Sequence, residues 1–163
     1  MKAIQIRGRN GASAILVGEV LESLASYAPL DKTMIITDTN LCRHYRKDFP
    51  PSWNVVEIPS GERAKSLETV KEICLRLMEM GADRSSFIVG IGGGVVSDIA
   101  GFVASIYMRG IRFGFVSTTL LAQVDAGIGG KNGVNLDGYK NMVGVFSEVN
   151  HESERDQEKN RQH

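Results

Sequence analysis

The stretch FIVGIGGGVVSD, residues 87–98, decides the fold. Its first five residues form a continuous apolar run, typical of a strand buried on both faces, and a helical pattern follows from Val95 to about Tyr107. Three glycines, Gly92, Gly93 and Gly94, join the two elements. Such a turn lets backbone N–H groups at a helix N-terminus approach an anion. The stretch therefore predicts a ligand at the carboxyl end of a buried parallel strand.

The same alternation of strand and helix patterns continues on both sides of this stretch. Strands are predicted over residues 3–6, 14–17, 33–37, 54–58 and 112–116, and helices over residues 19–27, 39–45, 67–80 and 118–124. Alternation at this spacing predicts an α/β fold with a Rossmann-like, doubly wound parallel sheet. We expect a single domain over residues 1–146. The remaining residues, 147–163, are polar with one aliphatic side chain, so we expect a disordered tail, or alternatively a helix docked on a partner.

The composition excludes several classes of function. The 19 basic and 19 acidic side chains balance, which leaves no electrostatic footprint for nucleic acid or for an anionic membrane. Cys42 and Cys74 lie far apart with no CxxC motif, as expected of a reduced, cytoplasmic protein. We find no signal peptide and no apolar run near the roughly 20 residues that a membrane span needs.

Two strand ends carry candidate binding residues. The glycine turn matches neither GxGxxG nor a P-loop, so taken alone it is also compatible with a tight turn that binds nothing. Asp98, expected in the first turn of the following helix, suits the helix dipole and could accept hydrogen bonds from a sugar hydroxyl. Thr118 and Thr119 follow the next strand, where they could cap a helix or contact a phosphate.

A glycine-rich segment, DAGIGGKNGVN at residues 125–135, follows, and Lys140-Asn141 comes shortly after it. A lone loop lysine is usually a solvated charge, but two lysines in one weakly charged, glycine-rich loop favour an anion site. Metal-ligand patterns are missing: His44 lies in a basic helix that we interpret as structural, and His151 and His163 lie in the polar tail.

The segment GGGVVSDIAGFVASIYMRGIRFGFVSTTLLAQVDAGIGGKNGVN, with KNMVGVF after it, resembles the 3-dehydroquinate synthases, which are sugar phosphate cyclases of the shikimate pathway of aromatic amino acid biosynthesis. The resemblance covers residues 1–146 and corresponds to the family's NAD-binding domain. It implies conversion of 3-deoxy-D-arabino-heptulosonate 7-phosphate, a phosphorylated sugar acid, to 3-dehydroquinate and phosphate. NAD would oxidise and later re-reduce a ring hydroxyl, and a homodimer is implied.

The resemblance also implies residue roles. Asp38, Asn40, Glu62 and Lys65 would contact the adenosine side of NAD, and Lys140 would contact NAD as well. Gly93, Gly94 and Val95 would hold the pyrophosphate, and Asp98, Thr118 and Thr119 would lie on the nicotinamide side. The catalytic and substrate-binding set would be Asp125, Lys131, Lys140 and Asn141, with Arg109 reaching the substrate phosphate from the other subunit of a dimer.

The family also uses a divalent metal, zinc or cobalt, whose Glu and His ligands come from a helical C-terminal domain. We find no such pattern in these 163 residues and expect the chain to be inactive alone. Two alternatives stay open. One is another NAD-dependent sugar phosphate cyclase or a polyol dehydrogenase, and the other is a non-catalytic nucleotide-binding or dimerising module.

Overall fold

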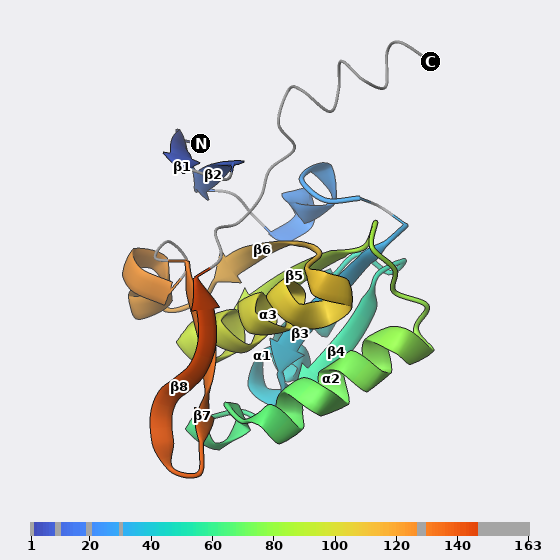
Figure 1. The fold of residues 1–163 in the computed structure, drawn as a ribbon. Coiled ribbons are helices and arrows are strands. Elements are labelled where there is room, and N and C mark those ends of the chain that lie inside the picture. Colours follow the sequence, from blue (N-terminus) through green and yellow to red (C-terminus); the bar gives the residue numbers. More distant parts are fainter. Residues whose placement is uncertain (1, 9–10, 19–20, 30, 127–129, 147–163) are drawn as a thin grey trace.

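A four-stranded parallel sheet forms the centre of the computed structural model, which describes residues 2–8, 11–18, 21–29, 31–126 and 130–146 (Figure 1). The strand order is β4-β3-β5-β6, and all three pairings are parallel. The bounds are Thr33–Asp38 for β3, Asn54–Ile58 for β4, Phe87–Gly92 for β5 and Arg112–Ser117 for β6. The predicted α/β fold and parallel sheet are confirmed.

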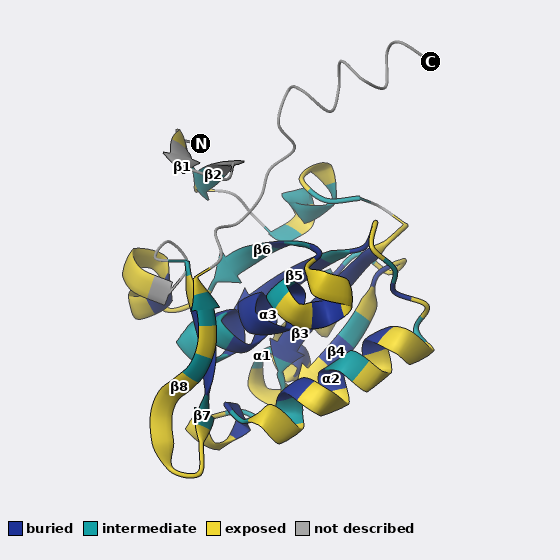
Figure 2. Cartoon of the chain, viewed as in Figure 1, coloured by how far each residue is buried: buried dark blue, intermediate teal, exposed yellow. Residues whose placement is uncertain are grey.

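Helical segments cover both faces of this sheet. On one face, α2 (Leu67–Glu79) and α3 (Gly94–Ile106) pack over β3, β4 and β5 in one apolar cluster. On the other face, η1 (Leu21–Ser26) and the Phe49–Trp53 segment pack against alternate residues of β3 and β5. Figure 2 shows the strands and α3 largely buried while α2 keeps an exposed outer face. The doubly wound arrangement is therefore confirmed.

Helix capping follows the sequence closely. Asp38 caps α1 (Thr39–Tyr45), which continues into η2 (Arg46–Asp48), and Ser66 caps α2 by accepting a hydrogen bond from the Thr69 amide. Val70, Ile73 and Leu77 form the buried stripe of α2. Side-chain oxygens at these positions satisfy N–H groups that the first turn of a helix leaves unpaired.

Three local predictions were wrong in detail. The first helix is a 3₁₀ turn, Leu21–Ser26, and residues 19–20 lie outside the described residues. The helix predicted over residues 118–124 is present but begins later: residues 120–121 are α-helical and lead into a π-helical turn, η5 (Ala122–Ala126). The two N-terminal strands are longer than predicted, β1 (Lys2–Gly8) and β2 (Gly11–Val17), and pair antiparallel in a separate two-stranded sheet.

The largest difference is at the predicted glycine-rich loop, which contains an antiparallel hairpin. β7 (Lys131–Leu136) and β8 (Tyr139–Phe146) pair with each other, and β7 packs along α3 (Figure 1). Asn132 is buried against Gly101 of α3, where an added Cβ would lie 2.1 Å from the Asn132 Oδ1 atom. The glycine thus lets the hairpin lie directly on the helix.

The polar segment 147–163 and residues 127–129 lie outside the described residues, so the predicted tail stays a prediction. None of the helices that the structure describes has the length and apolar character to cross a membrane.

Candidate functional site

The candidate site lies at the carboxyl edge of the sheet. β3 is central in the sheet, with β4 on one side and β5 on the other, so the strand order reverses between β3 and β5. The two strands end at Asp38 and at Gly92, and the next strand, β6, ends at Ser117. In open parallel sheets, ligands bind outside the carboxyl ends of the strands at such a reversal. The sheet therefore brings the predicted strand-end residues to one edge.

The glycine turn brings the start of α3 close to the end of β5. A Cβ on Gly92 would lie 2.5 Å from the Cβ of Val96, so a larger residue cannot occupy that position without a shift. Gly93 is the N-cap residue and has no side chain with which to cap the helix. The amides of the first helical turn, at Gly94 and Val95, are therefore available to an anion at the positive end of the helix dipole.

A buried ion pair lies beside this helix terminus. The Lys65 Nζ atom pairs with Asp98 Oδ2 and also donates to Asn141 Oδ1 at 2.6 Å. Lys65 is 6% exposed. Burial raises the pKa of Asp98 above its ordinary value and the nearby Glu62 and Asp125 charges add to the rise, while Lys65 opposes it. The predicted first-turn position of Asp98 was wrong: because α3 begins at Gly94, Asp98 falls in the second turn, where it faces Lys65.

The β7–β8 hairpin completes this arrangement through Asn135. The Asn135 side chain donates to Glu62 Oε1 at 2.9 Å and accepts from the Asn141 amide at 2.9 Å. Glu62 lies in η3 (Glu62–Ala64), directly before Lys65. Asn135 falls within the glycine-rich segment, and no role is predicted for it from the sequence. The Asp137-Gly138 pair is a strong hairpin signal, and it could have indicated this pairing.

Asp38 and Asn40 lie at the end of β3. Asp38 Oδ1 accepts hydrogen bonds from the amides of Asn40 at 2.9 Å and Leu41 at 3.0 Å, and from Ser60 Oγ at 3.2 Å. The carboxylate therefore holds the start of α1 and the segment after β4 together. Asn40 is exposed beside it.

Thr118 and Thr119 follow β6 and contact the glycine turn. The Thr118 amide donates to Gly92 O at 3.0 Å, and a Cβ on Gly93 would lie 3.1 Å from Thr119 Cγ2. Thr119 Oγ1 also accepts from the Ala122 amide at 3.3 Å, so the alternative role as a cap is present. The two threonines thus line the same turn as the α3 terminus.

The other predicted substrate residues are exposed on elements next to this edge. Lys131 begins β7, Lys140 lies in β8, and Asp125 lies in η5 and is close enough to act electrostatically on Asp98. All three side chains are exposed to solvent in this chain.

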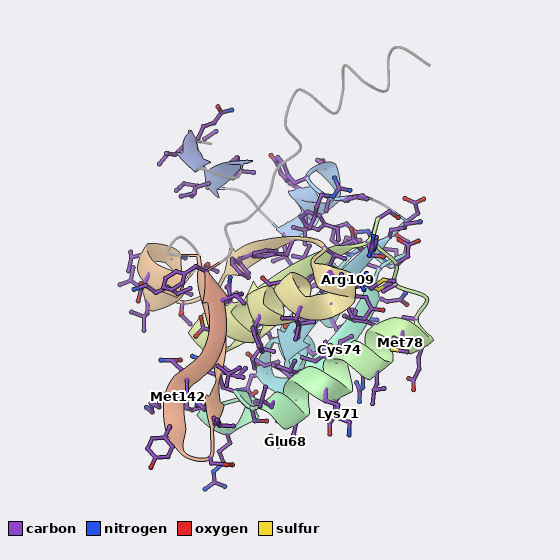
Figure 3. The ribbon with its side chains drawn as sticks, viewed as in Figure 1. Glu68, Lys71, Cys74, Met78, Arg109 and Met142 are labelled. Atoms are coloured by element: carbon purple, nitrogen blue, oxygen red, sulfur yellow. The ribbon has the colours of Figure 1, made fainter. Side chains whose placement is uncertain are left out.

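Arg109 is not brought together with these residues. It lies in η4 (Tyr107–Arg109), which follows α3 at the end opposite its glycine turn. Figure 3 shows Arg109 across the molecule from Met142, which lies on β8. Met108 and Arg109 have φ values of 50° and 71°, a left-handed backbone that non-glycine residues rarely adopt. Within one chain, Arg109 thus lies at the end of α3 away from the glycine turn.

No metal site is formed by the residues that the structure describes. Among them, no group of three or more His, Cys, Asp or Glu side chains is arranged to hold a metal ion. The described residues therefore offer no ligand set for a metal ion.

Comparison with known proteins identifies relatives of this chain. Residues 55–152 match the family model described as "3-dehydroquinate synthase N-terminal". The 3-dehydroquinate synthase of Pyrococcus abyssi is 58% identical over 133 residues, covering 82% of this chain and 35% of that protein. The chain spans between 25% and 43% of the length of the curated relatives that it matches most strongly.

Two solved structures are similar in fold and sequence. A 2-deoxy-scyllo-inosose synthase complexed with carbaglucose-6-phosphate, NAD+ and Co2+ is 32% identical, with a TM-score of 0.78 over 91% of this chain and 44% of that one. The 2-epi-5-epi-valiolone synthase ValA of Streptomyces hygroscopicus, with NAD+ and Zn2+ bound, is 30% identical, with a TM-score of 0.71 over 78% of this chain and 37% of that one.

Proposed function

Because the chain belongs to the 3-dehydroquinate synthase family through the match of its residues 55–152, we propose that it forms the dinucleotide-binding part of such an enzyme. The proposed reaction converts 3-deoxy-D-arabino-heptulosonate 7-phosphate to 3-dehydroquinate and phosphate, a step of the shikimate pathway. Residues 1–146 are the proposed NAD-binding domain. The cofactor complexes of the two similar synthases support this assignment.

The residues at the carboxyl edge fit a dinucleotide. The first turn of α3 offers amide donors and a positive dipole to a pyrophosphate, and the buried Lys65 supplies a cation beside it. NAD bound there would accept and return a hydride. The proposed contacts lie on the elements that meet at this edge: Asp38, Asn40, Glu62, Lys65, Gly93, Gly94, Val95, Asp98, Thr118, Thr119 and Lys140.

The substrate side is proposed to lie over the hairpin. Lys131 and Lys140 supply cations for a departing phosphate, and Asn141 and Asp125 offer polar contacts to the sugar acid. Arg109 lies at the far end of α3, so its proposed role in phosphate binding requires a second copy of the chain. We therefore propose a homodimer in which each copy contributes Arg109 to the other.

One observation carries the proposal most strongly. The Lys65 ammonium contacts Asp98, a proposed cofactor residue, and Asn141, a proposed substrate residue. These residues are separated from Lys65 by 33 and 76 positions in the sequence. A single buried cation thus holds the two proposed halves of the site side by side, and hydride transfer requires such closeness between cofactor and substrate.

Two further parts of the proposal concern the complete enzyme. A divalent metal, cobalt or zinc as in the two similar synthases, is proposed to act there, although the described residues form no site for it. We also propose a cytoplasmic location, because Cys42 and Cys74 are both free thiols.

Titration of the 163-residue chain with NAD tests the cofactor assignment. Lys65→Gln should weaken NAD binding by roughly tenfold or more, since hydrogen bonds to charged groups contribute about 1.5–3 kcal/mol. Lys71→Gln is the matched control, because Lys71 is exposed on the outer face of α2 (Figure 3). No NAD binding by the unmodified chain, or equal affinities in the two variants, would contradict the assignment.

A further inference from the structure

Asn135 makes hydrogen bonds to three different residues of the site. Its backbone amide donates to the carbonyl of Lys65 at 2.9 Å. Its side-chain Nδ2 donates to Glu62 Oε1 at 2.9 Å, and its Oδ1 accepts from the Asn141 amide at 2.9 Å. One residue therefore ties the segment before α2 to both strands of the hairpin.

The chemistry of these partners specifies an amide at position 135. An ionised Glu62 carboxylate only accepts hydrogen bonds, and the Asn141 backbone N–H only donates one. The Asn135 side chain supplies a donor to Glu62 and an acceptor for the Asn141 amide at the same time, each at 2.9 Å. An aspartate would keep the acceptor but would place a second carboxylate against Glu62.

The bond to Asn141 matters because the Asn141 backbone is unusual. Its φ is +56°, in the left-handed region, where asparagine is tolerated better than most residues but still at some cost in free energy. The Asn135 Oδ1 atom holds the Asn141 amide in this conformation. In the same conformation, the Asn141 Oδ1 atom meets the Lys65 ammonium at 2.6 Å.

We propose that Asn135 is a positioning residue: it fixes the backbone of Asn141 and thereby sets where the Lys65 ammonium lies relative to Asp98. The hydrogen bond from Asn135 to Lys65 goes to the backbone carbonyl, and the ammonium of Lys65 bonds to Asn141, so Asn135 acts on the ammonium through Asn141. The significance of this arrangement for cofactor binding rests on the proposed function. The link from Asn135 through Asn141 to Lys65 does not depend on it.

The test uses Asn135→Ala in the full 163-residue chain, with Asp137→Asn as the matched control. Asp137 lies in the hairpin turn with φ 45°, a conformation that asparagine also adopts, and it is exposed. The Asn135 backbone bond to Lys65 survives the alanine change, so we expect the hairpin to stay docked. Amide exchange at Asn141 and the titration of the Asp98 carboxyl, both followed by NMR, report the two links separately.

In Asn135→Ala, we expect the Asn141 amide to exchange about fivefold faster, as the loss of one hydrogen bond requires. The pKa of Asp98 should rise further above its ordinary value, because the Lys65 ammonium no longer has a fixed position. The control should change neither. A loss of packing alone would expose Asp98 and lower its pKa, the opposite direction, because burial is the main cause of the rise.

Asn135→Asp separates the hydrogen bond to Glu62 from the hydrogen bond to Asn141. It keeps the acceptor for Asn141, so we expect exchange at that amide to return close to the unmodified rate. If exchange at Asn141 and titration of Asp98 in Asn135→Ala match the control, or if Asn135→Asp restores no protection, the proposal is overturned. A chain that shows these links but binds no NAD would refute the proposed cofactor and leave the positioning role standing.

Discussion

Replacing Lys65 with methionine should make the stability of the protein strongly dependent on pH. Methionine approximates the length of the lysine stem and lacks its charge, so the change removes the cation from Asp98 with little loss of packing. The carboxylate then lacks its partner, in a side chain that is only 20% exposed, and Glu62 and Asp125 remain near it as like charges.

The size of the effect follows from this burial. Removing one partner from a fully buried ion pair costs about 3–5 kcal/mol. Because Asp98 keeps some contact with solvent, we expect a smaller loss, about 2–3 kcal/mol of unfolding free energy at pH 7. At low pH the protonated carboxyl needs no cation, so the penalty should shrink to about 1 kcal/mol or less.

The direction with pH can be worked out from the pKa of Asp98. Burial already raises the folded-state pKa above the unfolded value, and loss of Lys65 raises it further. The folded state then binds more protons than the unfolded state above about pH 4, the ordinary pKa of Asp. The contribution of Asp98 to the stability of the variant should therefore be greatest in acid and should fall as the pH rises toward and through the folded pKa of this carboxyl.

Urea unfolding at about pH 4, 5.5 and 7 measures this penalty. Asp98→Asn provides the reference, because an amide of the same shape does not titrate. In the Asp98→Asn background, Lys65→Met should cost the same free energy at all three pH values. The reasoning would be refuted by a penalty that is independent of pH in the unmodified background, or by one that keeps its pH dependence in the Asp98→Asn background.

Three more predictions concern the turn and the substrate side. Gly92→Ala should destabilise the chain by about 1–3 kcal/mol in thermal unfolding, since its Cβ would lie 2.5 Å from both Cβ and Cγ2 of Val96; Val96→Ala should recover only the part due to the γ carbons, because alanine keeps the Cβ. In the complete enzyme, Lys131→Ala should abolish turnover while NAD affinity, measured by titration, stays unchanged; equal loss of both would show a cofactor role. Arg109→Ala should also lose turnover, and mixing it with Lys131→Ala should restore activity if Arg109 acts across subunits, because a mixed dimer contains one intact site; no recovery on mixing would contradict the dimer.

The sheet and its strand-end residues could be predicted because their signals are local. The runs at β3 and β5 are continuous and apolar, and glycine or a capping residue ends each of them. The hairpin was missed because polar residues and glycine outnumber the apolar residues in β7, and two of its buried positions are Asn132 and Val134. The contact that holds it, Gly101 against Asn132, involves residues from separate elements.

The pairing of Lys65 with Asp98 could not be derived from sequence patterns. It depends on where α3 begins and on how the segment before α2 passes the helix terminus, and both are set by tertiary packing. From the sequence, Asp98 is predicted to lie in the first turn of α3, where a carboxylate suits the helix dipole. A helix start one residue earlier than expected was enough to place it in the second turn, opposite a lysine 33 positions away.

The strand order β4-β3-β5-β6 has a consequence for the time at which the chain can fold during synthesis. β3 is central, yet its partner β5 begins 54 positions later in the pairing register, at Phe87 opposite Thr33. The helix that closes one face, α3, ends only at Ile106. Until synthesis has passed Ile106, the apolar residues of β3 have an unpaired edge and an incompletely covered face. Non-local pairing of this kind folds slowly and leaves strands open to aggregation. A nascent chain that stalls before α3 is therefore the form most in need of a chaperone.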